Sequence, residues 1–266
     1  MHIHPYLAKA CCADLYQSQL ARLILGDTLH PGGLALTNRL GRLMGIQPGQ
    51  WVADLASGRG ISAIAVSRVF HCNVVGVEFG AAAAAEARTG SLVSPASPRC
   101  FFVQGDAESP PLQSSSLDAV YCECSMSIFP DKARAVAEAA RILRPGGRFG
   151  LSDVTVEPGC LPVELGGVLG RVLCLADAPT VEGYIRLLHQ GGLTLRHQQD
   201  ASAELLKLLD DLEAKLGAFI AWQNIARQDR AGLDMLRGAP RLIASLRRLV
   251  GEGRLGYWLL VAEKPA

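Results

Sequence analysis

Val52-Ala53-Asp54-Leu55-Ala56-Ser57-Gly58-Arg59-Gly60 is the stretch of this sequence that says most about its fold. It begins as a short apolar strand, predicted over 51–55, and ends in a Gly-x-Gly turn ahead of a helix predicted over 61–69. Glycine lets the backbone of such a turn approach a ligand closely at the carboxyl edge of a sheet. A single Gly-x-Gly also occurs in ordinary turns, so the neighbouring elements have to support this interpretation.

Strands and helices alternate after this turn. Apolar stretches predict strands over 73–77, 100–103, 117–122 and 148–154, with helices over 80–88 and 132–143 between them. The alternation predicts parallel pairing in a doubly wound α/β sheet with right-handed crossovers. Pro145-Gly146-Gly147 is expected to form a turn ahead of the fifth strand.

The remaining elements surround this core. Helices are predicted over 15–25, 34–44, 163–175, 181–188, 204–225 and 241–250, and strands over 193–197 and 256–262. The last strand is expected to complete a mostly parallel, seven-stranded sheet. We therefore divide the chain into an N-terminal helical lid (1–47), a core (48–155) and a C-terminal part (156–266) that finishes the sheet and adds helices.

Composition narrows the class of protein. The 266 residues include 26 Lys and Arg against 25 Asp and Glu, and this net charge of +1 gives no basis for binding nucleic acid. Hydrophobic residues make up 49%, enough for a buried core, but no run of about 18 apolar residues predicts a membrane span. No secretion signal is visible, so we expect a cytoplasmic protein whose eight cysteines stay reduced.

The turn departs from the pattern of dinucleotide-binding proteins. Ala63 stands where their third glycine would be, and Asp54 lies directly ahead of the turn. A carboxylate there would repel a pyrophosphate, but it could accept hydrogen bonds from an ammonium group. Glu78 ends the second strand, where one carboxylate can accept from both hydroxyls of a ribose. Asp106 follows the third strand and could accept from an exocyclic amine. These positions predict a site for a nucleoside with a cationic amino-acid tail.

Four motifs in order resemble the class I S-adenosylmethionine-dependent methyltransferases. They are Ala53–Gly60, Gly76-Val77-Glu78, Gly105-Asp106-Ala107 and Leu143-Arg144-Pro145-Gly146-Gly147-Arg148. The resemblance implies a Rossmann-like methyltransferase fold with S-adenosylmethionine as cofactor. It also implies the cofactor-binding residues Asp54, Ser57, Gly58, Gly60, Glu78, Asp106, Ala107, Cys122 and Glu123.

The chain after the fourth strand resembles the arsenite methyltransferase branch of that family. Glu123-Cys124 stands in place of the branch's Asn-Cys, and Pro130-Asp131-Lys132 follows at the same offset. Downstream, Cys174-Leu175-Ala176-Asp177-Ala178 is similar to the branch's Cys-Ile-x-Gly-Ala. The resemblance implies that Cys124 and Cys174 bind As(III) and act in catalysis. The branch's further cysteine has no clear counterpart, and only Cys11 and Cys12 are candidates for it.

The chemistry of arsenic agrees with such a site. As(III) is soft and prefers thiolates, which can hold it with its lone pair directed at the sulfonium methyl. No general base is needed, and the rate comes mostly from positioning. The substrate would then be a metalloid, delivered as a thiol adduct.

Two other functions stay open. The protein could methylate an organic small molecule at oxygen, nitrogen or carbon, with Glu123 or His30 orienting or deprotonating the acceptor. A loop histidine such as His30 is, however, more often structural. Alternatively, a protein that retains the cofactor fold could sense thiophilic metals without transferring a methyl group. Cys72 and Cys100, at strand starts, are expected in the core, and the role of Cys160 stays open.

Overall fold

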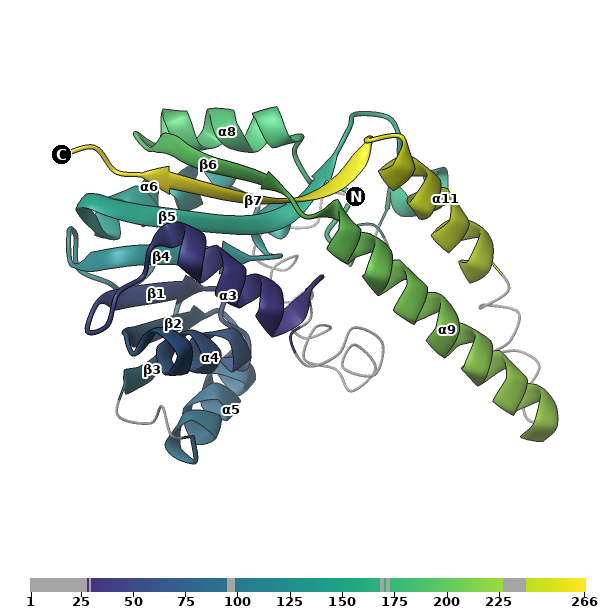
Figure 1. The fold of residues 1–266 in the computed structure, drawn as a ribbon, viewed down its shortest axis with the longest axis horizontal. Helices are drawn as coiled ribbons and strands as arrows, with labels where there is room; N and C mark the ends of the chain where they lie inside the picture. The colour runs from purple at the N-terminus through teal and green to yellow at the C-terminus, as the bar shows by residue number, and fades with distance from the viewer. Residues whose placement is uncertain (1–27, 29, 95–98, 168–169, 171–172, 227–237) are drawn as a thin grey trace.

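Seven strands form one sheet in a computed structural model that describes residues 28, 30–94, 99–167, 170, 173–226 and 238–266 (Figure 1). The strands are β1 (Trp51–Leu55), β2 (Asn73–Glu78), β3 (Cys100–Gln104), β4 (Leu117–Glu123), β5 (Leu143–Val156), β6 (Thr194–Asp200) and β7 (Leu255–Glu263). Their order is β3-β2-β1-β4-β5-β7-β6. Strands β1 to β5 pair in parallel, and β7 is antiparallel to both β5 and β6. The predicted mostly parallel, doubly wound sheet is confirmed.

Helices cover both faces of the sheet. They are α3 (Gly33–Met44), α4 (Ile61–Phe70), α5 (Ala81–Leu92), α6 (Lys132–Ile142), α8 (Val181–Gln190), α9 (Ser202–Ala226) and α11 (Ala239–Gly251). One buried cluster joins α3, α4, α9 and α11 to the sheet, and a second joins α6 and α8 to it from the other side. In Figure 1, α9 and α11 project from one end of the sheet.

The carboxyl ends of β1, β2 and β4 meet where the strand order reverses, which is where open α/β sheets bind ligands. Gly60 and Gly76 make this edge compact, because the ring of Phe102 lies against both of them. A Cβ atom on either glycine would come within 2.4 Å of that ring. Gly60 also has a φ of 77°, a conformation that favours glycine. These contacts fix the turn between β1 and α4.

Two predicted elements were wrong in part. β5 begins at Leu143, which pairs with Leu117 of β4, so the residues predicted to form a turn lie inside the strand. They form an irregularity there, because the next pair is Ala119 with Arg148 and Gly146 has a left-handed φ of 75°. The stretch predicted as a helix over 163–175 starts instead as a 3-10 helix, Val163–Leu165, that ends at Gly166. Cys174 has a left-handed φ of 61°, so it does not lie in a helix.

Other predictions stand or lie outside the described chain. α3 ends at Met44, as predicted for the helix over 34–44, and α8 covers the helix predicted over 181–188, with the Thr180 side chain capping it by accepting from the Gly183 amide. Cys72 and Cys100 are buried, as predicted. The helix predicted over 15–25, with Cys11 and Cys12 ahead of it, lies outside the described residues. Within those residues, no helix combines the length and the apolar character that crossing a membrane requires.

Candidate active site

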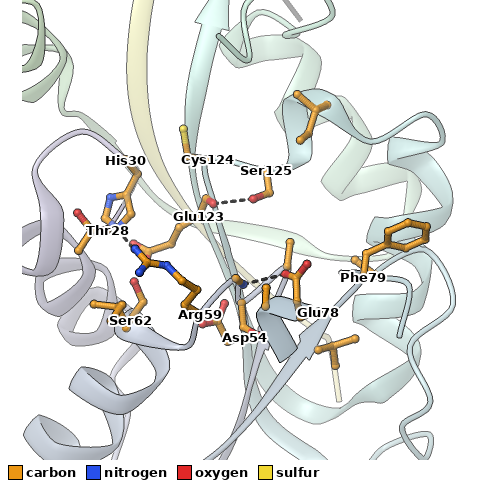
Figure 2. A pocket seen from close by; sticks show the side chains of 18 of the residues that line it. Thr28, His30, Asp54, Arg59, Ser62, Glu78, Phe79, Glu123, Cys124 and Ser125 are labelled. Carbon is orange, nitrogen blue, oxygen red and sulfur yellow. Dashed lines mark hydrogen bonds and ion pairs between the residues drawn. The ribbon is translucent and has the colours of Figure 1, made fainter. Parts of the chain in front are cut away.

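A pocket opens at the carboxyl edge of the sheet (Figure 2). Its walls come from the loop before α3, the turn between β1 and α4, and the segments that follow β2, β3 and β4. Among the residues with polar or aromatic side chains, the pocket is lined by Thr28, His30, Asp54, Ser57, Arg59, Ser62, Glu78, Phe79, Asp106, Glu123, Cys124, Ser125 and Phe129. The turn between β1 and α4 and the loop after β3, both predicted to bind a nucleoside, therefore face the same pocket as His30 and Cys124.

Glu78 ties the glycine turn to the end of β2. Its Oε2 accepts from the Gly58 amide at 2.8 Å, and its Oε1 accepts from the Gly80 amide at 2.7 Å. Burial nevertheless raises the pKa of the Glu78 carboxyl, and these amides partly offset the effect. Each carboxylate oxygen has a second lone pair, so Glu78 keeps acceptor capacity toward the pocket.

Asp54 presents an incompletely satisfied carboxyl group to the pocket. It is 3% exposed, and its Oδ2 has no hydrogen-bond partner of standard geometry among the described residues. Burial, followed by the negative charge of Glu123, raises the pKa of Asp54 well above its usual value, although the Tyr121 hydroxyl lowers it. A buried carboxyl in need of a partner suits a cationic ligand group.

Asp106 lies in the loop after β3. Its Oδ1 accepts from the Glu108 amide at 2.9 Å, which holds the carboxylate in place, and Ala107 beside it also lines the pocket. The described residues thus place three carboxylates along one wall, at the ends of β1, β2 and β3. Carboxylate oxygens can accept hydrogen bonds from an ammonium group, a ribose diol and an exocyclic amine. These residues therefore fit S-adenosylmethionine.

Three residues that were predicted to belong to the site do not line the pocket. Gly60 packs against Phe102 and begins α4. Cys122 is fully buried in the core, and burial raises the pKa of its thiol well above the usual value. Cys174 is 2% exposed and is not among the lining residues. The side chains of Asp54, Ser57, Glu78, Asp106 and Glu123, in contrast, all face the pocket.

His30 and Glu123 form a buried pair on the opposite wall (Figure 2). Nε2 of His30 lies 3.6 Å from Oε2 of Glu123, and both side chains are almost fully buried. Nδ1 of His30 lies 3.1 Å from the Pro31 carbonyl oxygen, which can only accept a hydrogen bond. Nδ1 therefore carries a proton, and in the neutral ring Nε2 is left with a free lone pair. This geometry is that of a proton acceptor next to a carboxylate.

Glu123 is itself held from two sides. Thr37 of α3 donates to Oε2 at 2.9 Å, and Ser152 of β5 lies 3.4 Å from Oε1. Neither Thr37 nor Arg59, which also lines the pocket, stood out in the sequence. The only available signal for Thr37 is its place two helical turns after His30, on the face of α3 that packs against the sheet.

Cys124 and Cys174 do come together. Sγ of Cys174 lies 3.6 Å from the backbone oxygen of Cys124. Both residues have a left-handed φ, which is 61° for Cys174 and 49° for Cys124. A hydrogen bond with the Cys174 side chain and burial raise the pKa of the Cys124 thiol well above its usual value. The thiol form of Cys124 is therefore favoured over the thiolate. No group of three potential metal ligands occurs among the described residues, and Cys11 and Cys12 lie outside them.

Comparison with known proteins agrees with this nucleoside pocket. Residues 53–151 match a family model described as a methyltransferase domain. The chain is 25% identical to 27-O-demethylrifamycin SV methyltransferase of Amycolatopsis mediterranei, over 90% of this chain and 86% of that protein. It is 28% identical to the arsenite methyltransferase of Halobacterium salinarum, over 70% of this chain and 48% of that protein.

Solved structures share the fold. The [4+2]-cyclase SpnF superposes with a TM-score of 0.76 at 20% identity, covering 99% of this chain and 98% of that one. Phosphoethanolamine N-methyltransferase 2 of Haemonchus contortus, solved with S-adenosyl-L-methionine, gives 0.75 at 17% identity, covering 96% and 60%. At these identities the likeness concerns the fold alone.

Proposed function

As an S-adenosylmethionine-dependent methyltransferase, the protein has to prepare a nucleophile beside its cofactor, and we propose that this nucleophile is a hydroxyl group of an organic small molecule. The observation that carries the proposal is the buried pair of His30 and Glu123 in the pocket wall. A hydroxyl is a weak nucleophile until its proton is removed, whereas arsenic has no proton to lose. A fixed base in the pocket therefore favours an oxygen acceptor.

In this proposal, different residues of the pocket bind different parts of the cofactor. Asp54 would meet the ammonium group of the cofactor, Glu78 its ribose hydroxyls, and Asp106 with Ala107 its adenine. When bound, S-adenosylmethionine supplies an electrophilic methyl group. His30 Nε2 takes the proton of the acceptor hydroxyl as the oxygen forms its bond to carbon. Glu123 then stabilises the charged imidazolium ring, because its Oε2 lies 3.6 Å from Nε2.

The relatives support an organic acceptor. The name of 27-O-demethylrifamycin SV methyltransferase describes transfer to an oxygen atom, and that protein aligns along most of this chain. The arsenite methyltransferase aligns over less than half of its own length.

Methylation of a soft metalloid is the second candidate, and the Cys124–Cys174 contact is the observation that favours it. Two neighbouring sulfurs can share one As(III) ion. Against this candidate, the raised pKa of Cys124 opposes formation of the thiolate that would bind the ion.

To test the proposal, the protein is incubated with S-adenosylmethionine and each member of a panel of acceptors, and the release of S-adenosylhomocysteine is measured. The panel contains hydroxylated aromatic and macrocyclic polyketides such as 27-O-demethylrifamycin SV, the same scaffolds with the hydroxyl blocked, matched amines, and arsenite with glutathione. We expect turnover with free hydroxyls and none with the blocked scaffolds. Turnover with arsenite alone would contradict the proposal and favour the metalloid.

A further inference from the structure

The hydroxyl group of Thr37 lies where four elements meet. Thr37 is in α3 and is 2% exposed. Its Oγ1 lies 2.9 Å from Glu123 Oε2 at the end of β4, 3.4 Å from His30 Nε2 in the loop before α3, and 3.4 Å from Ser62 Oγ in α4. A longer contact of 3.5 Å reaches the Gly33 carbonyl one turn earlier in α3.

One hydroxyl has a single proton to donate, and the distances indicate where it goes. Glu123 Oε2 is the nearest acceptor, at 2.9 Å against 3.4 Å or more for the others, and it is charged when ionised, so it takes the strongest hydrogen bond. Thr37 therefore binds the same carboxylate oxygen that faces His30. Within the described part of the chain, the other oxygen, Oε1, has the longer contact of 3.4 Å with Ser152.

We infer that Thr37 is a positioning residue, whose hydroxyl fixes Glu123 Oε2 against His30 Nε2 and so sets how well His30 accepts the proton of the acceptor. This inference rests on the proposed function. Without that hydrogen bond, the Glu123 carboxylate can rotate away from the imidazole ring. The other charged or acidic groups lining the pocket near this wall are Arg59, from the turn before α4, and Asp54, from β1.

Loss of the Thr37 hydroxyl should affect kcat more than KM. Hydrogen bonds to charged groups contribute enough that losing one should lower kcat by about tenfold or more. KM for the acceptor should change little, because Thr37 itself does not line the pocket.

The experiment compares Thr37→Val with Thr37→Ser in the full chain. Valine keeps the shape of threonine and removes the hydroxyl, while serine restores the hydroxyl. Thr89→Val is the matched control, because Thr89 is also a helical threonine but lies on an exposed part of α5, where its hydroxyl donates only to the Ala85 carbonyl among the described residues. Crystal structures with S-adenosylhomocysteine are determined for each variant, and kcat and KM are measured with a hydroxyl acceptor from the panel.

We expect the Glu123–His30 separation to lengthen in Thr37→Val, with a loss in kcat and little change in KM. Thr37→Ser and Thr89→Val should keep the wild-type geometry and rate. An unchanged Glu123 position in Thr37→Val, or equal losses in the valine and serine variants, would overturn the inference. The crystallographic result requires no acceptor. The proposed function is tested separately: if it is wrong, His30→Gln will keep full transfer activity.

Discussion

His30 Nε2 and Glu123 Oε2 lie 3.6 Å apart, joining the loop before α3 to the carboxyl end of β4 across one wall of the pocket. This contact brings a proton acceptor to the edge of the sheet where three other carboxylates face the pocket. The two walls therefore differ in what they do. We propose that Asp54, Glu78 and Asp106 bind the cofactor, and that the pair of His30 and Glu123 takes the proton of the acceptor.

Glu123→Gln tests the contribution of the negative charge. Glutamine has the size of glutamate and can still accept from Thr37, but it cannot stabilise a protonated His30. We expect kcat to fall by about 10- to 100-fold, within the range for losing support of a general base. Calorimetry with S-adenosylhomocysteine should show a much smaller loss of affinity. An affinity loss as large as the loss in kcat would instead assign Glu123 to cofactor binding.

Cofactor binding should weaken in acid. Burial raises the pKa values of Asp54 and Glu78 in the free protein, so both carboxyls become protonated at a higher pH than usual. A protonated carboxyl is a poorer partner for an ammonium group or a diol. We expect the affinity for S-adenosylhomocysteine to fall as the pH is lowered, and to do so at a higher pH than carboxyl groups with ordinary pKa values would require. In Glu78→Gln the affinity should start lower and vary less with pH. A flat profile in the wild-type protein would contradict this assignment.

Asp153 should make stability depend on pH. It is 1% exposed, and burial raises its pKa to about 6, although the Ser127 and Val154 amides donate to it. The folded state thus favours the protonated carboxyl, whose ordinary pKa is about 3.9. This stabilisation is complete below about pH 4 and is lost as the pH rises through about 6, to the extent of about 3 kcal/mol.

Urea unfolding across that pH range measures the effect of Asp153. The free energy of unfolding of the wild-type protein should fall with pH relative to that of Asp153→Asn, which has no proton to lose at this position. Asp211→Asn, on the exposed face of α9, is the control and should follow the wild type. Parallel curves for Asp153→Asn and the wild type would show that Asp153 titrates at an ordinary pH in the folded protein.

Serine at Cys124 or Cys174 separates the two candidate functions. If the acceptor is a hydroxyl, Cys124→Ser and Cys174→Ser should keep transfer within about threefold, because serine preserves the small buried side chain. If the acceptor is As(III), either change should abolish transfer. Cys160→Ser is the control, since Cys160 is only partly buried and its thiol lies 3.6 Å from the Arg254 carbonyl oxygen.

The order of the strands could be predicted from the sequence because each strand and helix of the core has a local pattern. The carboxylates of Asp54, Glu78 and Asp106 could be predicted for a related reason. They end neighbouring parallel strands, and the carboxyl ends of such strands meet at one edge. Element boundaries were harder to predict: Pro145-Gly146-Gly147 has the composition of a turn, but it forms an irregularity inside β5, because Leu143 ahead of it already pairs with Leu117.

His30 and Glu123 could be named from the sequence as separate candidates, but no local sequence pattern predicts that they form a pair. Thr37 and Glu123 meet only because α3 packs over the end of β4, and a single sequence does not show which helix face meets which strand. Cys124 and Cys174 both adopt left-handed backbone conformations where they meet, and their sequence context does not suggest these conformations.

The most direct test of His30 as the base is the rate of methyl transfer to a hydroxyl acceptor in His30→Gln, measured in a single turnover at saturating S-adenosylmethionine. His189→Gln, at an exposed position near the end of α8, is the control. We predict that His30→Gln loses about 10²- to 10⁴-fold in rate while it still binds S-adenosylhomocysteine as tightly as the wild type. Transfer at the wild-type rate in His30→Gln would contradict the assignment of His30 as the base.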